Sequence, residues 1–139
     1  MKAAIAVVMF SNATLFFFGA LQHAGVALGP FHEPYIVPAA IVETICGVAL
    51  VAGGTALLTG WRRWGMALVG NLVALGGVLL GRAALAAGRG PRTASNDFYH
   101  NLMLVLIGIA IVLLLAARAA YYRKQGGSCP FSSSLKATN

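Results

Sequence analysis

Four apolar stretches constrain this chain more than any other feature of its sequence. They cover residues 4–29, 36–58, 65–88 and 98–120. Each approaches or exceeds the ~20 residues that an α-helix needs to cross about 30 Å of hydrocarbon. The breaks carry turn residues, namely Gly29 and Pro30, Thr59 and Gly60, and Gly88 to Pro91. We therefore predict an all-α fold, an integral membrane four-helix bundle in which short loops make sequential helices antiparallel.

The composition excludes the main alternatives to a membrane protein. Residues of the set AVILMFWYC make up 59% of the chain and charged residues only 9%, whereas soluble domains carry about a quarter charged residues. So many apolar residues exclude a disordered chain, and two cysteines are too few for a disulfide-stapled module. We assign residues 1–124 to the bundle and residues 125–139, rich in Gly and Ser, to a flexible tail.

The first stretch also suits a cleaved signal peptide, because Lys2 precedes an apolar run. The run is too long for that, however, and no small-residue cleavage site follows it. Phe18 and Gln22 occupy the positions that small residues would need before Ala20 and Ala24. We therefore expect this stretch to be retained as the first helix.

Basic residues in the loops predict the orientation of the bundle, because cytoplasmic loops are enriched in Lys and Arg. The side with both termini and the second loop carries Lys2, Arg62, Arg63, Arg118, Arg123, Lys124 and Lys136. The other side carries Arg82, Arg89 and Arg92. We therefore predict both termini in the cytoplasm, with the bundle in a bacterial inner membrane. Because the basic residues are split among short loops, nucleic-acid binding is not expected.

Trp and Tyr give an independent check on the four crossings, since both prefer membrane interfaces. Trp61, Trp64, Tyr121 and Tyr122 fall at the predicted cytoplasmic ends, and Tyr35 and Tyr99 fall at the outer ends. This placement supports a lipid bilayer as the first partner of the chain.

Titratable and amide side chains gather in the outer half of the predicted bundle. At about 1.5 Å per residue, Glu43 and Arg82 reach nearly the same depth on two different helices. Ionisable groups there are unfavourable by roughly 2–3 kcal/mol each on insertion scales. We predict an ion pair or a shared hydrogen-bond network between Glu43 and Arg82. We also predict a ligand-binding pocket lined by Gln22, His23, Glu43, Arg82, His100 and Asn101.

Helical spacing turns these residues inward. Asn71, Leu75, Val78 and Arg82 form one stripe, Asn12 and His23 share a face, and Glu43, Gly47 and Gly54 form a third stripe. Gly47 and Gly54 are predicted to allow close helix packing, and Asn12 and Asn71 to join helices nearer the cytoplasmic side.

Structural roles compete with each of these assignments. Arg82 can extend its charged end to the interface, and His23 can form a bond between helices with no ligand. His100 and Asp97 lie at a helix start, where Asn96 or Asp97 can act as the cap. His32 and Glu33 can be solvated loop residues. Glu43 is the hardest to explain in this way, because a carboxylate inside a membrane helix needs a partner or a proton.

The sequence contains no strong catalytic motif: CxxC, GxSxG, HExxH and a phosphate loop are all absent. Cys46 and Cys129 are expected to be free thiols. A Zn or Fe site built from His23, Glu43 and His100, or a haem between the two histidines, is a weaker alternative. A quinone or another amphipathic ligand fits better, since a histidine and a carboxylate in an apolar cleft can exchange protons with a quinone carbonyl.

The second helix resembles the DoxX-like family of small four-helix membrane proteins. The resemblance lies in the segment PAAIVE from Pro38 to Glu43, in Gly47, in Gly53 and Gly54, and in the basic turn Arg62-Arg63. Elsewhere only the four-helix plan matches, and Gln22 and His23 stand where the family often has Gly and Lys. The family assignment carries over to Pro38, Glu43 and Gly47.

The resemblance implies a role in redox chemistry, because members of this family resemble membrane subunits of redox systems. They include a thiosulfate:quinone oxidoreductase subunit and a partner in oxidative-stress complexes. Our leading hypothesis is a redox-associated or quinone-interacting accessory subunit, with other membrane or redox subunits as partners. A non-catalytic scaffold is the second hypothesis. A small transporter or lipid-modifying isomerase, with Glu43 and His23 handling protons, is the third. Whether the protein is an enzyme stays open.

Overall fold

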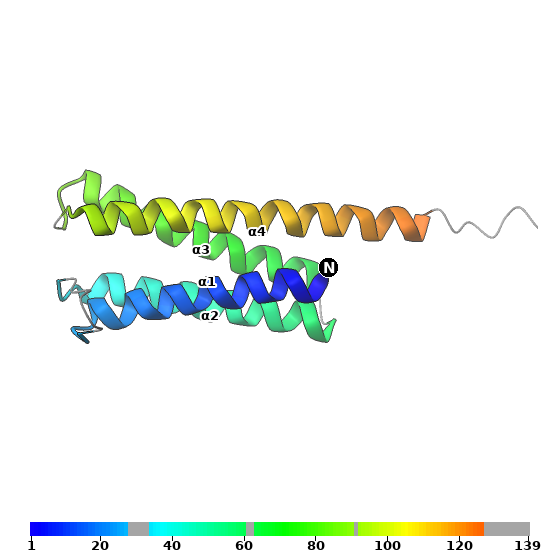
Figure 1. The fold of residues 1–139 in the computed structure, drawn as a ribbon, viewed down its shortest axis with the longest axis horizontal. Helices are drawn as coiled ribbons and strands as arrows, with labels where there is room; N and C mark the ends of the chain where they lie inside the picture. The colour runs from blue at the N-terminus through cyan, green and yellow to red at the C-terminus, as the bar shows by residue number, and fades with distance from the viewer. Residues whose placement is uncertain (28–33, 61–62, 91, 127–139) are drawn as a thin grey trace, which may run out of the picture.

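The structure is a computed structural model that describes residues 1–27, 34–60, 63–90 and 92–126. These residues form four α-helices, α1 (Lys2–His23), α2 (Val37–Thr59), α3 (Arg63–Ala86) and α4 (Ala94–Gly126). All four are long and apolar enough to cross a membrane, and they lie side by side (Figure 1). The all-α prediction with four helices is therefore confirmed. His32, Glu33, Cys129 and most of the predicted tail lie outside the described residues.

Glycines end three of the helices by adopting a left-handed backbone. Gly25, with φ 87°, follows α1, and the amide of Val26 donates to the Leu21 carbonyl at 3.0 Å. This Schellman pattern ends α1 at His23, before the predicted limit at residue 29. Gly88 ends α3 in the same way with φ 71°, and Gly60 caps α2 with φ 87°.

The helix α4 begins earlier and ends later than the sequence predicts. Thr93 caps its start, since its Oγ1 accepts the Asn96 amide at 3.1 Å, so the expectation that Asn96 or Asp97 caps this helix is wrong. At its other end, α4 includes Gln125 and Gly126, which the sequence analysis assigned to the tail. Its 33 residues span about 50 Å, so α4 is longer than the hydrocarbon layer is thick.

Sequential helices pack antiparallel, and the α1–α2 and α2–α3 interfaces are the most extensive. At Gly47 and Gly54 of α2, a Cβ would lie 2.7 Å from the Phe17 ring and 3.0 Å from the Phe10 ring, both of α1. The two glycines therefore make room for aromatic rings of the neighbouring helix. The interfaces of α4 with α3 and α1 are smaller.

The two asparagines of the predicted packing set are buried in the bundle. Asn12 is 1% exposed and Asn71 is 0% exposed. Asn71 Nδ2 donates to the Ala67 carbonyl at 2.9 Å, so this bond runs within α3 rather than to a neighbouring helix.

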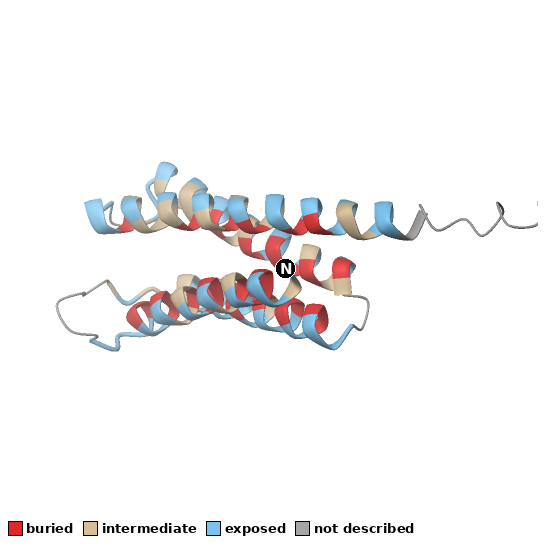
Figure 2. Ribbon diagram, turned by 45° about the vertical axis from the view of Figure 1, so that its right-hand side comes forward, coloured by how far each residue is buried: buried red, intermediate tan, exposed pale blue. Residues whose placement is uncertain are grey.

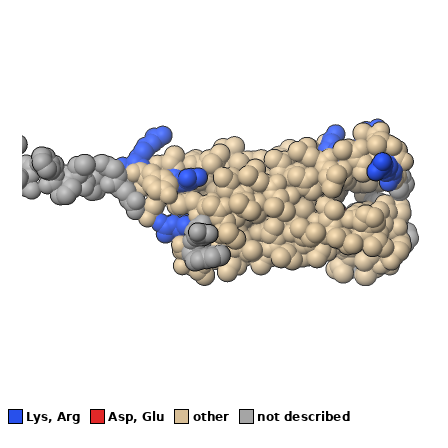
Figure 3. All heavy atoms as spheres, turned by 180° about the vertical axis from the view of Figure 1, so that it is seen from behind, with Lys and Arg blue, Asp and Glu red and all other residues tan. Residues whose placement is uncertain are grey.

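Buried residues follow the facing sides of the helices, and exposed residues cover the outward faces (Figure 2). The outward faces are themselves apolar, with Val48 55%, Leu72 50% and Val112 66% exposed. Figure 3 shows Lys and Arg side chains at the two ends of the molecule, with an uncharged belt between them on the face in view. An apolar surface of this extent suits contact with lipid and is rare on soluble monomers.

Candidate functional site

A buried histidine and a buried carboxylate meet where α1 ends and α2 begins. His23, the last residue of α1, is 7% exposed, and Glu43 of α2 is 8% exposed. His23 Nε2 lies 4.0 Å from Glu43 Oε1, which is an electrostatic contact rather than a hydrogen bond. The sequence analysis placed both residues in one pocket, and the structure brings them together.

The second ring nitrogen of His23 is held by the backbone. Nδ1 lies 3.3 Å from the carbonyl oxygen of Pro34, and a carbonyl oxygen only accepts, so Nδ1 carries the hydrogen. Nε2 therefore faces the carboxylate either with its lone pair or, in the imidazolium, with a second proton. The pair can thus hold a proton on His23 or on Glu43.

Gly19 of α1 makes room for the carboxylate. A Cβ at this position would lie 2.8 Å from both Glu43 carboxylate oxygens and 2.9 Å from Cδ. Any larger residue here would push the carboxylate away from α1. The position of Glu43 therefore depends on a glycine that the sequence analysis did not single out.

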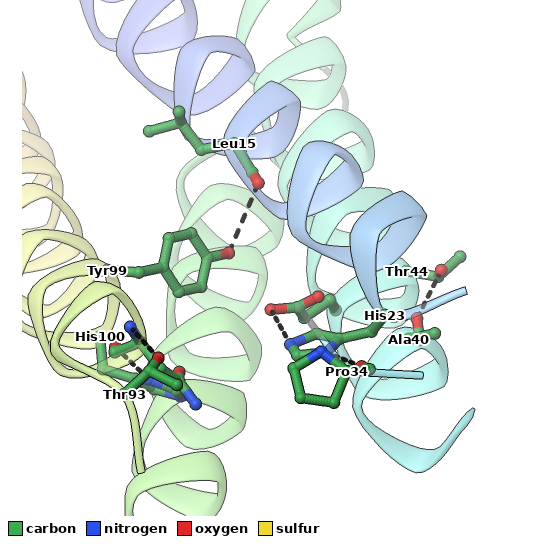
Figure 4. A network of polar contacts seen from close by, with 10 residues as sticks. Leu15, His23, Pro34, Ala40, Thr44, Thr93, Tyr99 and His100 are labelled. Carbon is green, nitrogen blue, oxygen red and sulfur yellow. Dashed lines mark hydrogen bonds and ion pairs between the residues drawn. The ribbon is translucent and has the colours of Figure 1, made fainter. Parts of the chain in front are cut away.

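Tyr99 of α4 faces this pair from the other side. Its hydroxyl donates to the Leu15 carbonyl of α1 at 3.4 Å and interacts with the Glu43 carboxylate. Figure 4 shows the phenol pointing from α4 toward α1, with His23 across the same space and His100 on the other side of Tyr99. A third helix thus contributes a hydroxyl group to the site.

A cavity of about 240 Å³ lies between these residues. Its walls come from α1, α2 and the first turns of α4, and most of its lining is apolar. The polar lining residues are Gln22, His23, Glu43, Ser95, Asn96 and Tyr99, and the apolar ones include Leu15, Phe18, Phe98 and Leu102. Gln22 Nε2 is buried and has no hydrogen-bond partner among the described residues, so the site offers an unused donor.

Two exposed aromatic rings lie at the outer rim of the cavity. Phe98 is 68% exposed and Phe18 is 38% exposed, on the outward faces of α4 and α1. The cavity therefore lies next to the seam between these two helices, where the bundle would meet acyl chains.

The remaining predicted site residues lie elsewhere, on the α3–α4 side. Arg82 Nη1 donates to Asn101 Oδ1, and His100 Nδ1 bonds the Asn96 carbonyl at 2.9 Å. The three residues are absent from the lining of the cavity. The predicted ion pair between Glu43 and Arg82 is wrong, because Arg82 faces α4 whereas Glu43 faces α1.

A metal site finds no geometric support. His23 and Glu43 do not converge with His100, whose Nε2 faces Gly81 of α3. Residues 1–27, 34–60, 63–90 and 92–126 contain no group of three or more His, Cys, Asp or Glu that could hold a metal ion.

Tyr99 is a site residue that was not predicted as one, because tyrosine at a helix end is typical of the interface belt. The signal that could have revealed it is a helical stripe on α4 at spacings of four and three, whose members after Tyr99 are 0–1% exposed. The stripe contains Tyr99, Met103, Ile107, Ala110, Leu114 and Ala117.

Comparison of the chain with models of known protein families, with curated proteins and with solved structures finds no match. The resemblance to the DoxX-like family therefore stays a prediction from the pattern of the second helix.

Proposed function

We propose that this protein is a DoxX-like membrane protein whose cavity between α1, α2 and α4 binds the headgroup of a quinone, and that it serves as a redox-associated accessory subunit. The observation that carries the proposal is the set of buried polar groups on one lipid-side cavity. His23 and Glu43 face each other there, Gln22 offers an unused donor, and Tyr99 adds a hydroxyl.

The size of the cavity favours a headgroup over a whole molecule. Sites that enclose a drug-sized ligand measure roughly 300–1,000 Å³, and this cavity measures about 240 Å³. A ligand with an apolar tail can place its polar ring inside and leave the tail between Phe18 and Phe98, which are exposed on the outward faces. A ring with two carbonyl groups matches donors from α1 and α4.

The chain supplies binding and proton transfer rather than electrons. A bound quinone takes up two electrons and two protons on reduction, and the electrons would come from a partner redox subunit. Gln22 Nε2 is a donor suited to a carbonyl oxygen, and the Tyr99 hydroxyl would donate to a second one by giving up its 3.4 Å bond to the Leu15 carbonyl. The His23–Glu43 pair can hold one of the two protons and pass it to an oxygen that develops negative charge, and the second proton would come from the aqueous side.

We further propose the orientation that the basic residues predict, with both termini in the cytoplasm of a bacterial cell and the cavity in the outer leaflet of its inner membrane. The ends of α2 and α3 that meet near Gly60 would then be cytoplasmic. His23 and Thr93 would mark the outer end.

The experiment is photolabelling with an azido-quinone of the protein purified into lipid nanodiscs, with labelled peptides located by mass spectrometry. We expect labels on α1 and the first turns of α4, and a loss of labelling in Glu43→Gln and Tyr99→Phe. His100→Gln is the matched control, since His100 neighbours Tyr99 in sequence but does not line the cavity.

Two outcomes would count against quinone binding. Labelling spread over all four helices, or equal losses in Tyr99→Phe and His100→Gln, would remove the cavity as the binding site. Stability losses in Glu43→Gln without any specific labelling of the parent protein would favour the scaffold hypothesis instead.

A further inference from the structure

The opposite end of the bundle carries a second hollow, built from the start of α3 and the end of α4. Its volume is about 820 Å³, and its walls include Arg63, Trp64, Val69, Arg118, Tyr121 and Tyr122. A neighbouring hollow of about 460 Å³ is lined by Lys2, Lys124, Trp64 and Tyr121. Trp64 and Tyr121 line both, so the two hollows share an aromatic wall with cationic groups on either side.

The cations at this end lie over aromatic rings. The Arg63 guanidinium is 4.4 Å from the centre of the Tyr121 ring, Arg118 is 5.8 Å from that of Tyr122, and Lys2 is 5.7 Å from that of Tyr121. Cation–π contact restrains the side chain and leaves the N–H groups at the guanidinium edge free to donate to oxygen.

No acidic side chain occurs in the segments that form this end. The protein has only three, Glu33, Glu43 and Asp97. Glu43 contacts His23, and Asp97 pairs with Arg92 at 3.3 Å near the start of α4. Glu33 belongs to the segment between α1 and α2. The described side chains of α1, α3 and α4 at this end therefore include several cations and no carboxylate.

Trp64 adds a second, independent indication of a ligand. The residue is 6% exposed, and its Nε1 is buried with no hydrogen-bond partner among the described residues. Indole N–H is a donor only, so the missing partner is an acceptor. Two arginines and an indole whose buried N–H lacks an acceptor line one hollow, and this set matches an anionic group rich in acceptor oxygens.

We propose that this hollow binds the phosphate of an anionic phospholipid. Trp and Tyr beside Lys and Arg at the end of apolar helices mark the level of lipid headgroups, and basic pockets there bind anionic headgroups. The wall nearer the middle of α3 is apolar, since Met66 and Val69 line it. Val69 is 53% exposed on the outward face of the helix. Acyl chains therefore have a surface to follow, which free phosphate would not use.

The test is native mass spectrometry of the full chain released from mixed vesicles of phosphatidylglycerol and phosphatidylcholine. We expect retained phosphatidylglycerol, and a loss of about fivefold in its affinity for each arginine removed in Arg63→Gln and Arg118→Gln. Trp64→Phe, which keeps the ring and removes the N–H, should also weaken retention. Arg89→Gln makes the same charge change at the other end of the bundle and should have no effect.

Control measurements distinguish a phospholipid headgroup from free phosphate as the bound anion. Competition by inorganic phosphate as strong as that by phosphatidylglycerol would show a free-anion site and overturn the lipid proposal. Equal retention of both lipids, or equal losses in Arg63→Gln and Arg89→Gln, would also overturn it. Circular dichroism verifies the fold of each variant. If Trp64→Phe does not fold, the loss of lipid affinity in Arg63→Gln decides the proposal. Azido-quinone labelling should be unchanged in the arginine variants, because the arginines do not line the quinone cavity. Failure of the lipid proposal is therefore distinguishable from failure of the proposed function.

Discussion

Gly19→Ala is the substitution that tests the geometry of the proposed site most directly. The added Cβ would lie 2.8 Å from both oxygens of Glu43, and the carboxylate must retreat by about 0.6 Å before ordinary contact begins at 3.4 Å. The carboxylate is the end of a flexible side chain and borders the cavity of about 240 Å³, so it can move there by leaving its position beside His23. The predicted result is a displaced carboxylate and a less stable bundle.

The magnitude follows from comparison with a second glycine. Alanine is favoured over glycine inside a helix by about 1 kcal/mol, and this gain applies equally to Gly76, where a Cβ would meet nothing within 4 Å. Overpacking a filled interior is destabilising by about 1–3 kcal/mol. Because the carboxylate can move into the adjoining cavity, the free energy of unfolding of Gly19→Ala should fall below that of Gly76→Ala by about 1 kcal/mol, the lower end of that range.

The assay is reversible unfolding in mixed micelles, with increasing sodium dodecyl sulfate and helix content followed by circular dichroism. Removing the carboxylate should relieve the clash, so in a Glu43→Ala background Gly19→Ala should become neutral or stabilising. A Gly19→Ala that destabilises both backgrounds equally would refute the placement of Glu43 against α1, because coupling between contacting residues appears as non-additivity.

Three further predictions concern the rest of the bundle. Gly70→Ala should have a free energy of unfolding about 1–3 kcal/mol below that of Gly76→Ala, since its Cβ would meet a backbone carbonyl oxygen of α2 that cannot rotate away; stability equal to that of Gly76→Ala in the same micelle assay would contradict this. Arg82→Ala and Asn101→Ala should be non-additive by about 0.6 kcal/mol, as for hydrogen bonds between membrane helices, and strict additivity would exclude their bond. In a chain without its native cysteines, a cysteine at Arg89 should react with an impermeant maleimide in intact cells and one at Lys124 only after lysis; the reverse pattern would invert the proposed orientation.

The number of helices, and the fact that each is long enough to cross a membrane, follow from the sequence because they depend on local properties. Apolar runs of membrane length and glycine breaks predict four helices, and the structure contains them. The limits were less accurate, since a left-handed glycine cap ends α1 inside a run that stays apolar beyond Gly25. Thr93 was missed as the cap of α4 because Asn96 and Asp97 have equally suitable side chains.

The candidate site was only partly predictable, because residue counting gives depth but not rotation. Glu43 and Arg82 were assigned to nearly the same depth, yet they face different neighbours. Tyr99 was assigned to the lipid interface by its residue type, whereas its phenol donates to α1. The stripe from Met103 onward indicates which face of α4 is buried. It does not indicate which residues of α3 and α1 that face packs against.

The position of the cavity follows from how the bundle closes. The α1–α2 and α2–α3 interfaces are extensive, whereas α1 and α4 share the smallest of the main interfaces. The cavity lies at that seam, with the 3.4 Å bond from Tyr99 to Leu15 spanning it. The proposed quinone would therefore enter from lipid by separating α1 from α4 locally, while the α1–α2 packing that holds His23 against Glu43 stays intact. A tail-bearing ligand needs such lateral access, because its polar ring must reach buried donors while its tail stays among acyl chains.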